Sequence, residues 1–210
     1  MNNPLYPLRM LWPLLACAFL LGGCLTPTAS TLHTLQPLRQ QPLGSEFADF
    51  KEIVLLMPVQ LAPHLQGRGL LNRQPTGAST ASATHLWAGP LDQQIGQQIV
   101  AALKDFLATD NVALYPGPRF GVIRYQLEVE MSEFSAGGGA FSTVAVWTLS
   151  DAAGKTILHR QTFRQTQPID KTDYSGYAAS ASQAVADLSK EVAQALLTAR
   201  RSQPEPPARP

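Results

Sequence analysis

The sequence predicts an α+β domain of a three-layer, α/β-like kind, with an antiparallel-rich mixed sheet and two long helices packed against it. Three observations support this fold class. Residues 122–134 alternate between apolar and polar side chains, two further strand-like segments follow them, and apolar stripes at helical spacing run along residues 87–109 and 174–199. A period of two residues predicts a strand, and a period of 3.6 predicts a helix that buries one stripe against a sheet.

The first predicted elements are a strand, a helix and a second strand. Residues 53–57 (IVLLM) form a short apolar run that ends at Pro58, which predicts a strand buried on both faces. In the helix that follows, Pro90 is expected at the first helical position and Asp92 in the first turn, where an acidic side chain is favourable. Residues 112–116 (VALYP) then predict a short strand.

Three strands and a helix complete the domain, so the order is strand, helix, four strands, helix. The alternating segment should bury one face, made of Tyr125, Leu127, Val129 and Met131. Three glycines at 137–139 predict a hairpin turn before a strand over 141–149, in which Trp147 is expected in the core. After a turn at 150–154, residues 155–166 close an antiparallel meander, and Asp173 is the expected N-cap of the last helix.

Three stretches are predicted to lack stable structure because they are poor in large apolar side chains. They are a tether after Cys24 that reaches residue 50, the segment 74–83 (QPTGASTASA), and the tail 201–210. A tether of roughly 25 residues would let the domain stand tens of ångströms from its anchor. The expected division is therefore 1–23, 24–50, a single periplasmic domain at 51–200, and the tail.

The chain begins with features of a lipoprotein signal peptide. Residues 11–21 carry no charge and follow Arg9, but the run is shorter than the roughly 20 residues that span a bilayer. The sequence LLGGC at 20–24 resembles a bacterial lipobox. It predicts cleavage between Gly23 and Cys24 and attachment of lipid to the Cys24 thiol, since a thiolate is a strong nucleophile.

Cleavage would remove Cys17 and leave one cysteine, so no disulfide can form within the mature chain. The several acyl chains of a mature lipoprotein anchor a protein firmly, whereas one chain does not. Leu25 follows the cysteine in place of aspartate. By resemblance to the sorting rule of enteric bacteria, this predicts the outer membrane, with the domain facing the periplasm.

Composition and spacing argue against several classes of function. Without Arg9 the mature chain has fifteen basic and fifteen acidic residues, which predicts no nucleic-acid partner. The four histidines (33, 64, 85 and 159) show no metal-ligand spacing, and no cofactor motif or nucleophile motif is present. Glu128 and Glu130 share a strand face, where a solvated surface is the simpler interpretation than acid–base catalysis. We therefore expect no enzyme, no metal and no cofactor.

Four stretches resemble the PqiC-like family of auxiliary lipoproteins in ABC-type transport systems that contain MCE-domain proteins. They are VLLMPVQLAPHLQGRGLLNR at 54–73, HLWAGPL at 85–91, TLQPL at 34–38, and the small-residue pattern with SQA at 182–184 and LS at 188–189. The chain departs from the family where Leu86 replaces an arginine, where His33 or Leu32 replaces a tyrosine, and where residues 74–83 lengthen a loop.

The resemblance implies a non-enzymatic component that helps move lipid or hydrophobic solute between the inner and outer membranes, with an MCE-domain protein as partner. Trp87 and Pro90 would be partner-surface residues, although Trp87 could instead be a buried side chain that fixes the start of the first helix. Two other functions remain open at this stage: a lipoprotein for outer-membrane assembly, and a module that itself carries lipid. A homo-oligomer also remains open.

Overall fold

The longest strand, β7 (Ile123–Gly137), is the centre of the sheet in the computed structural model, which describes residues 29–49, 51–117, 121–169 and 174–202. One edge of β7 pairs antiparallel with β8 (Ala140–Asp151), and β8 pairs antiparallel with β9 (Ile157–Pro168). Gly138 and Gly139 turn the chain between β7 and β8 with φ of 61° and 85°, values that glycine adopts easily. The predicted meander and its glycine turn are confirmed.

The other edge of β7 pairs with three short strands that follow one another in the chain. These are β2 (Ile53–Leu56), β3 (Gln60–Leu61) and β4 (Gly69–Arg73), all parallel to β7, with a 3-10 helix η1 (Pro63–Leu65) between β3 and β4. On its far side β2 pairs in parallel with β6 (Val112–Leu114). All four residues of β2 are buried, as the apolar run predicts.

The segment 74–83 is not loosely held, contrary to the sequence prediction. A turn at Gln74–Ala78 leads into β5 (Ser79–Trp87), which pairs antiparallel with β4. The turn is closed by hydrogen bonds from Gln74 N to Ala78 O (2.8 Å) and from Gly77 N to Gln74 O (2.9 Å). Backbone pairing therefore orders a segment whose side chains are too small and polar to show a strand pattern.

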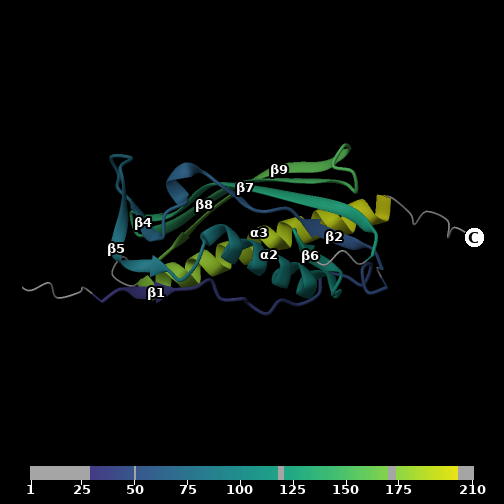
Figure 1. Cartoon of the computed structure of the whole chain (residues 1–210), viewed down its shortest axis with the longest axis horizontal. Helices are drawn as coiled ribbons and strands as arrows, with labels where there is room; N and C mark the ends of the chain where they lie inside the picture. The colour runs from purple at the N-terminus through teal and green to yellow at the C-terminus, as the bar shows by residue number, and fades with distance from the viewer. Residues whose placement is uncertain (1–28, 50, 118–120, 170–173, 203–210) are drawn as a thin grey trace, which may run out of the picture.

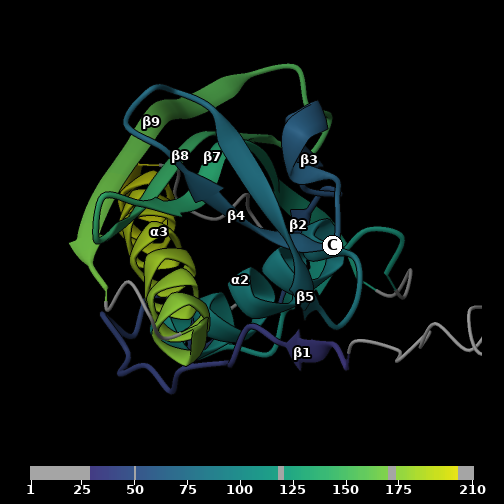
Figure 2. The ribbon, with the colours of Figure 1, turned by 90° about the vertical axis from the view of Figure 1, so that its left-hand side faces the viewer.

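Two helices fill the concave side of the sheet, which curls over them (Figures 1 and 2). They are α2 (Leu91–Leu107) and α3 (Tyr174–Ser202). Asp92 lies in the first turn of α2 as predicted, whereas Pro90 is the N-cap and not the first helical residue. Helix α2 ends at Leu107, and its C-cap Ala108 has a left-handed φ of 51°. The predicted cap Asp173 lies outside the described residues.

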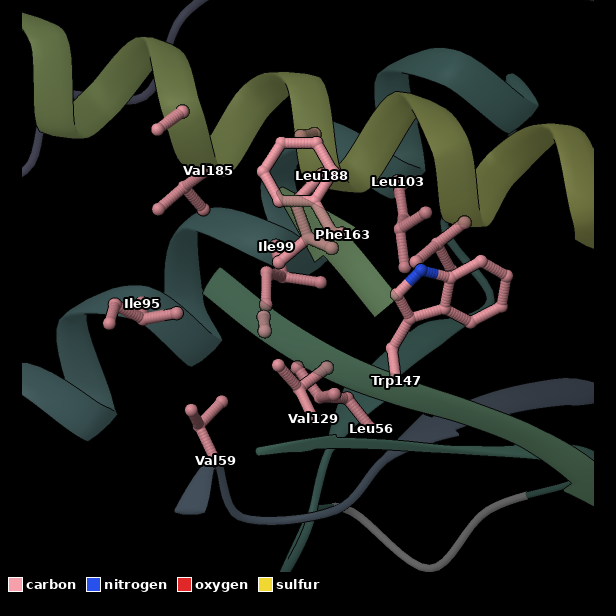
Figure 3. Close-up of a cluster of buried hydrophobic side chains, with 14 of the residues drawn as sticks. Leu56, Val59, Ile95, Ile99, Leu103, Val129, Trp147, Phe163, Val185 and Leu188 are labelled. Atoms are coloured by element: carbon pink, nitrogen blue, oxygen red, sulfur yellow. The ribbon is translucent and has the colours of Figure 1, made fainter. Parts of the chain in front are cut away.

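The core lies between the sheet and the helices (Figure 3). The predicted inner face of β7 is confirmed, because its four apolar side chains are at most 1% exposed. Trp147 from β8 is fully buried, as predicted, and Leu103 from α2 and Leu188 from α3 are fully buried in the same cluster.

All seven predicted elements are present, and the α+β class with a mixed sheet is confirmed. The long strand pairings are antiparallel, whereas the pairings of β1 (Thr31–His33), β2, β3 and β6 are short and parallel. Sequence reasoning missed β1, β3, β4 and β5. No helix in the described part of the chain is long and apolar enough to cross a membrane.

Candidate functional site

The residues predicted to carry function lie in different places. Gly23 and Cys24, the predicted cleavage and lipid-attachment residues, lie outside the described residues. Pro90 is exposed at the start of α2 and lines a shallow pocket with Gln60, Gln66 and Asp92. Trp87 is only 2% exposed, so its side chain is not available to a partner in this conformation.

Trp87 belongs to a buried cluster of aromatic rings at one end of the sheet. Its ring centroid lies 6.3 Å from that of Phe134 and 6.0 Å from that of Tyr177. Phe141 packs edge to face against both Phe134 (4.9 Å) and Tyr177 (5.0 Å). Trp87 is therefore buried, as in the structural alternative given above, but its ring packs the end of β5 against the sheet and α3, whereas that alternative placed it at the start of the first helix.

An N-terminal strap, which we define as residues 31–47, lies along the helices on the side away from the sheet (Figure 2). It begins with β1, which pairs in parallel with the end of β5. Leu35 is 8% exposed and Phe47 is fully buried. Sequence reasoning treated these residues as part of a flexible tether, but the strap is an integral part of the folded domain.

Hydrogen bonds to both helices hold the strap in place. The N–H of Leu35 donates to Gln94 Oε1 (3.1 Å), and the N–H of Gln36 donates to Ser182 Oγ (2.9 Å). The buried Gln98 side chain donates from Nε2 to Gln36 O (3.0 Å) and Ser182 O (2.9 Å). One amide group thus joins the strap, α2 and α3.

The strap ends beside the last turn of α3. Phe47 packs against Tyr125, with 6.5 Å between ring centroids. Next to it, Arg201 Nε donates to Glu46 Oε1 (2.9 Å), and this hydrogen bond lowers the pKa of the Glu46 carboxyl. The pair is exposed to solvent, so it orients the strap more than it stabilises the domain.

At the other end of the domain, β1 pairs with the last residues of β5, and His85 of β5 stacks on Tyr174 in the first turn of α3. Tyr174 also lines one cavity with two hairpin turns, which contain Pro75 and Gly138. We call this region the β1 end; it comprises Thr31–His33, the turn 74–78, Gly138–Gly139, Ile169 and Tyr174. His33 Nε2 lies 3.0 Å from His85 Nδ1, and the His85 ring stacks on Tyr174 with 3.8 Å between centroids. The N–H of Ile169 donates to Gly139 O (2.9 Å). A cavity of about 300 Å³ lies here, lined in part by Pro75, Ile169, Tyr174 and Tyr177.

A second cavity, of about 500 Å³, lies between β9 and the C-terminal half of α3. Trp147 is at its base: the indole Nε1–H donates to Glu191 Oε1 (2.8 Å), and the ring stacks on His159 (4.8 Å). Gln161, Gln194, Thr198 and Ser202 complete its polar lining.

The described residues show no assembled catalytic or metal centre among the predicted candidates. No group of three or more His, Cys, Asp or Glu side chains in the described part could hold a metal ion. Glu128 and Glu130 are exposed on the outer face of β7, as a solvated surface requires. His64 lies in η1, whereas the contact between His33 and His85 joins β1 to β5.

The fold matches several solved structures, and no curated protein sequence matches the chain. A crystal structure of an uncharacterised protein covers 80% of this chain and 99% of its own, with 20% identity and a TM-score of 0.66. A protein from Xanthomonas campestris covers 83% and 96%, with 19% identity and a TM-score of 0.63. At these identities the two structures establish the fold alone.

The family is established by sequence. A family model of the ABC-type transport auxiliary lipoprotein component matches residues 33–193. The match begins in β1, spans the strap, the whole sheet and α2, and ends within α3. The chain therefore belongs to the family of ABC-type transport auxiliary lipoprotein components.

Proposed function

We propose that this chain is a non-enzymatic lipoprotein, anchored through Cys24 in the outer membrane, that serves an ABC transport system moving lipid or another hydrophobic solute between the inner and outer membranes. The domain faces the periplasm and contacts an MCE-domain protein. The observation that supports this most is the family match, which includes nearly every element of the fold.

The anchor is supported by the LLGGC sequence at the end of an uncharged run. It has a sharp test because the chain has only two cysteines. Cys24→Ala should leave the precursor uncleaved and without lipid, whereas Cys17→Ala, seven residues earlier in the same run, should be processed normally. Intact-mass measurement of the membrane-extracted protein distinguishes the two. Normal lipid attachment in Cys24→Ala would contradict the anchor.

The partner is tested by gentle cross-linking in cells, affinity capture of the tagged full-length lipoprotein, and mass spectrometry. We expect an MCE-domain protein, with recovery reduced in Cys24→Ala because the uncleaved precursor is not transferred to the outer membrane. Capture of a β-barrel protein instead would favour an assembly factor. Co-purification of phospholipid with a soluble form that begins at Leu25, without any protein partner, would favour a lipid carrier.

A further inference from the structure

We propose that the β1 end of the domain rests against the lipid surface in which Cys24 is anchored, so that the long axis of the domain points away from the membrane. This inference rests on the proposed function in one respect, since it takes Cys24 as the anchored residue. Its other support comes from the strap and from the distribution of charge.

The first argument is the length of the link. The strap is part of the fold from Thr31 onward, so only seven residue steps separate Cys24 from the first residue of β1. Even fully extended, seven steps span at most about 25 Å. A flexible link of that length has a typical reach of only about 15 Å. The anchor therefore holds the β1 end close to the bilayer.

The opposite end of the molecule cannot be equally close in this arrangement. Helix α3 starts at Tyr174 in the β1 end and runs for 29 residues to Ser202. At 1.5 Å per residue it is about 43 Å long. Figure 1 shows β1 and the C-terminal end of α3 at opposite ends of the longest axis.

The second argument is independent of the anchor: the described residues of the β1 end contain no Asp, Glu, Lys or Arg, and the exposed Arg68 beside them is engaged by the carbonyl of Trp87. Five described stretches reach this end and contain no Asp, Glu, Lys or Arg; they are 29–38, 74–91, 134–150, 165–169 and 174–186, of which 134–150 continues along β8 to the opposite end. Arg73 and Glu133 border this region and pair with each other at 2.9 Å. Asp170, Lys171 and Asp173, between two of these stretches, lie outside the described residues.

A surface with few charged side chains suits contact with lipid headgroups because few ions lose their water there. Leu32 is 56% exposed at this end, and the half-buried Tyr174 ring beside His85 is amphipathic, as are side chains at membrane interfaces. The opposite end, in contrast, carries ion pairs such as Arg201 with Glu46 and Lys104 with Asp110.

The test uses the lipidated protein in vesicles of phosphatidylethanolamine and phosphatidylglycerol that contain a headgroup nitroxide quencher. Lipid occupies the Cys24 thiol, so an introduced cysteine is the one free thiol of the mature chain. Thr76→Cys places a fluorophore on the β4–β5 turn at the β1 end, and Ala153→Cys places it on the β8–β9 turn at the opposite end. Both residues are exposed. Quenching should be several-fold stronger at Thr76→Cys.

Intact mass, measured first, separates the outcomes. If Cys24 carries lipid and the two labels are quenched equally, or Ala153→Cys more strongly, the proposed orientation is wrong while the anchor stands. If Cys24 carries no lipid, both the anchor and the orientation are wrong. Stronger quenching at Thr76→Cys on a lipidated chain supports the orientation.

Discussion

Trp147 links three elements through a single side chain. Its ring is fully buried in β8, stacks on His159 of β9, and donates a hydrogen bond to Glu191 of α3. Trp147→Phe removes the donor and part of the buried ring, so the free energy of unfolding should fall by about 2–3 kcal/mol. Urea denaturation of a soluble form that begins at Leu25 measures this loss.

Glu191→Gln is the matched control for Trp147. It keeps an oxygen that accepts the indole N–H, so the loss should stay below about 1 kcal/mol. An equal loss in the two variants would mean that the charge of Glu191, and not the presence of an acceptor, stabilises the contact.

Tyr177 makes the stability of the domain depend on pH in the alkaline range. Burial raises the pKa of its phenol above the ordinary value of 10, and the hydroxyl lies 3.5 Å from Phe134 O. The unfolded chain therefore loses this proton at lower pH than the folded chain. The protonated Tyr177 phenol therefore contributes fully to the free energy of unfolding below pH 10. As pH rises above 10, this contribution falls by about 1.4 kcal/mol per pH unit. Tyr177→Phe should remove this part of the pH dependence in urea titrations from pH 8 to 11; an unchanged slope would contradict it.

At the scale of elements, the strap is the feature that changes the expected architecture most. If it is part of the core, Phe47→Ala should lower the free energy of unfolding by about 3–5 kcal/mol, because a fully buried ring is removed. Leu32→Ala in the same strap is the control, since Leu32 is 56% exposed and should cost less than about 1 kcal/mol. Equal, small losses in urea denaturation would show that the strap is a loose tether after all.

The elements that sequence predicted and those that it missed differ in a physical way. β7 and α2 bury one face each, so their periodicity is visible in the sequence. β1 and β5 are ordered by backbone pairing, and the strap is held by bonds from Gln94, Gln98 and Ser182 on the helices. Such contacts leave no local pattern. The burial of Trp87 could not be predicted from the sequence for the same reason. Tryptophan occurs both at partner surfaces and in cores, and only the surrounding folded elements decide which position it takes.

At the scale of the whole molecule, the strap couples the fold to the predicted anchor. It converts a tether of roughly 25 residues into a link of seven steps, and it delivers that link to the β1 end. In the proposed orientation, the opposite end of the domain, with its ion pairs, points away from the membrane. The distance between membrane and domain is therefore a property of the fold that a longer link should alter.

Lengthening the link provides the test at this scale. An insertion of about 15 Gly and Ser residues between Leu25 and Thr31 raises the typical reach from about 15 Å to about 25 Å. Quenching of the Thr76→Cys label should then fall several-fold, while the urea midpoint stays the same because the strap is intact. The same insertion after Ser202 is the control and should change neither value. Undiminished quenching with the longer link would mean that the β1 end binds lipid by its own affinity, with Leu32 and Tyr174 as the side chains to replace next.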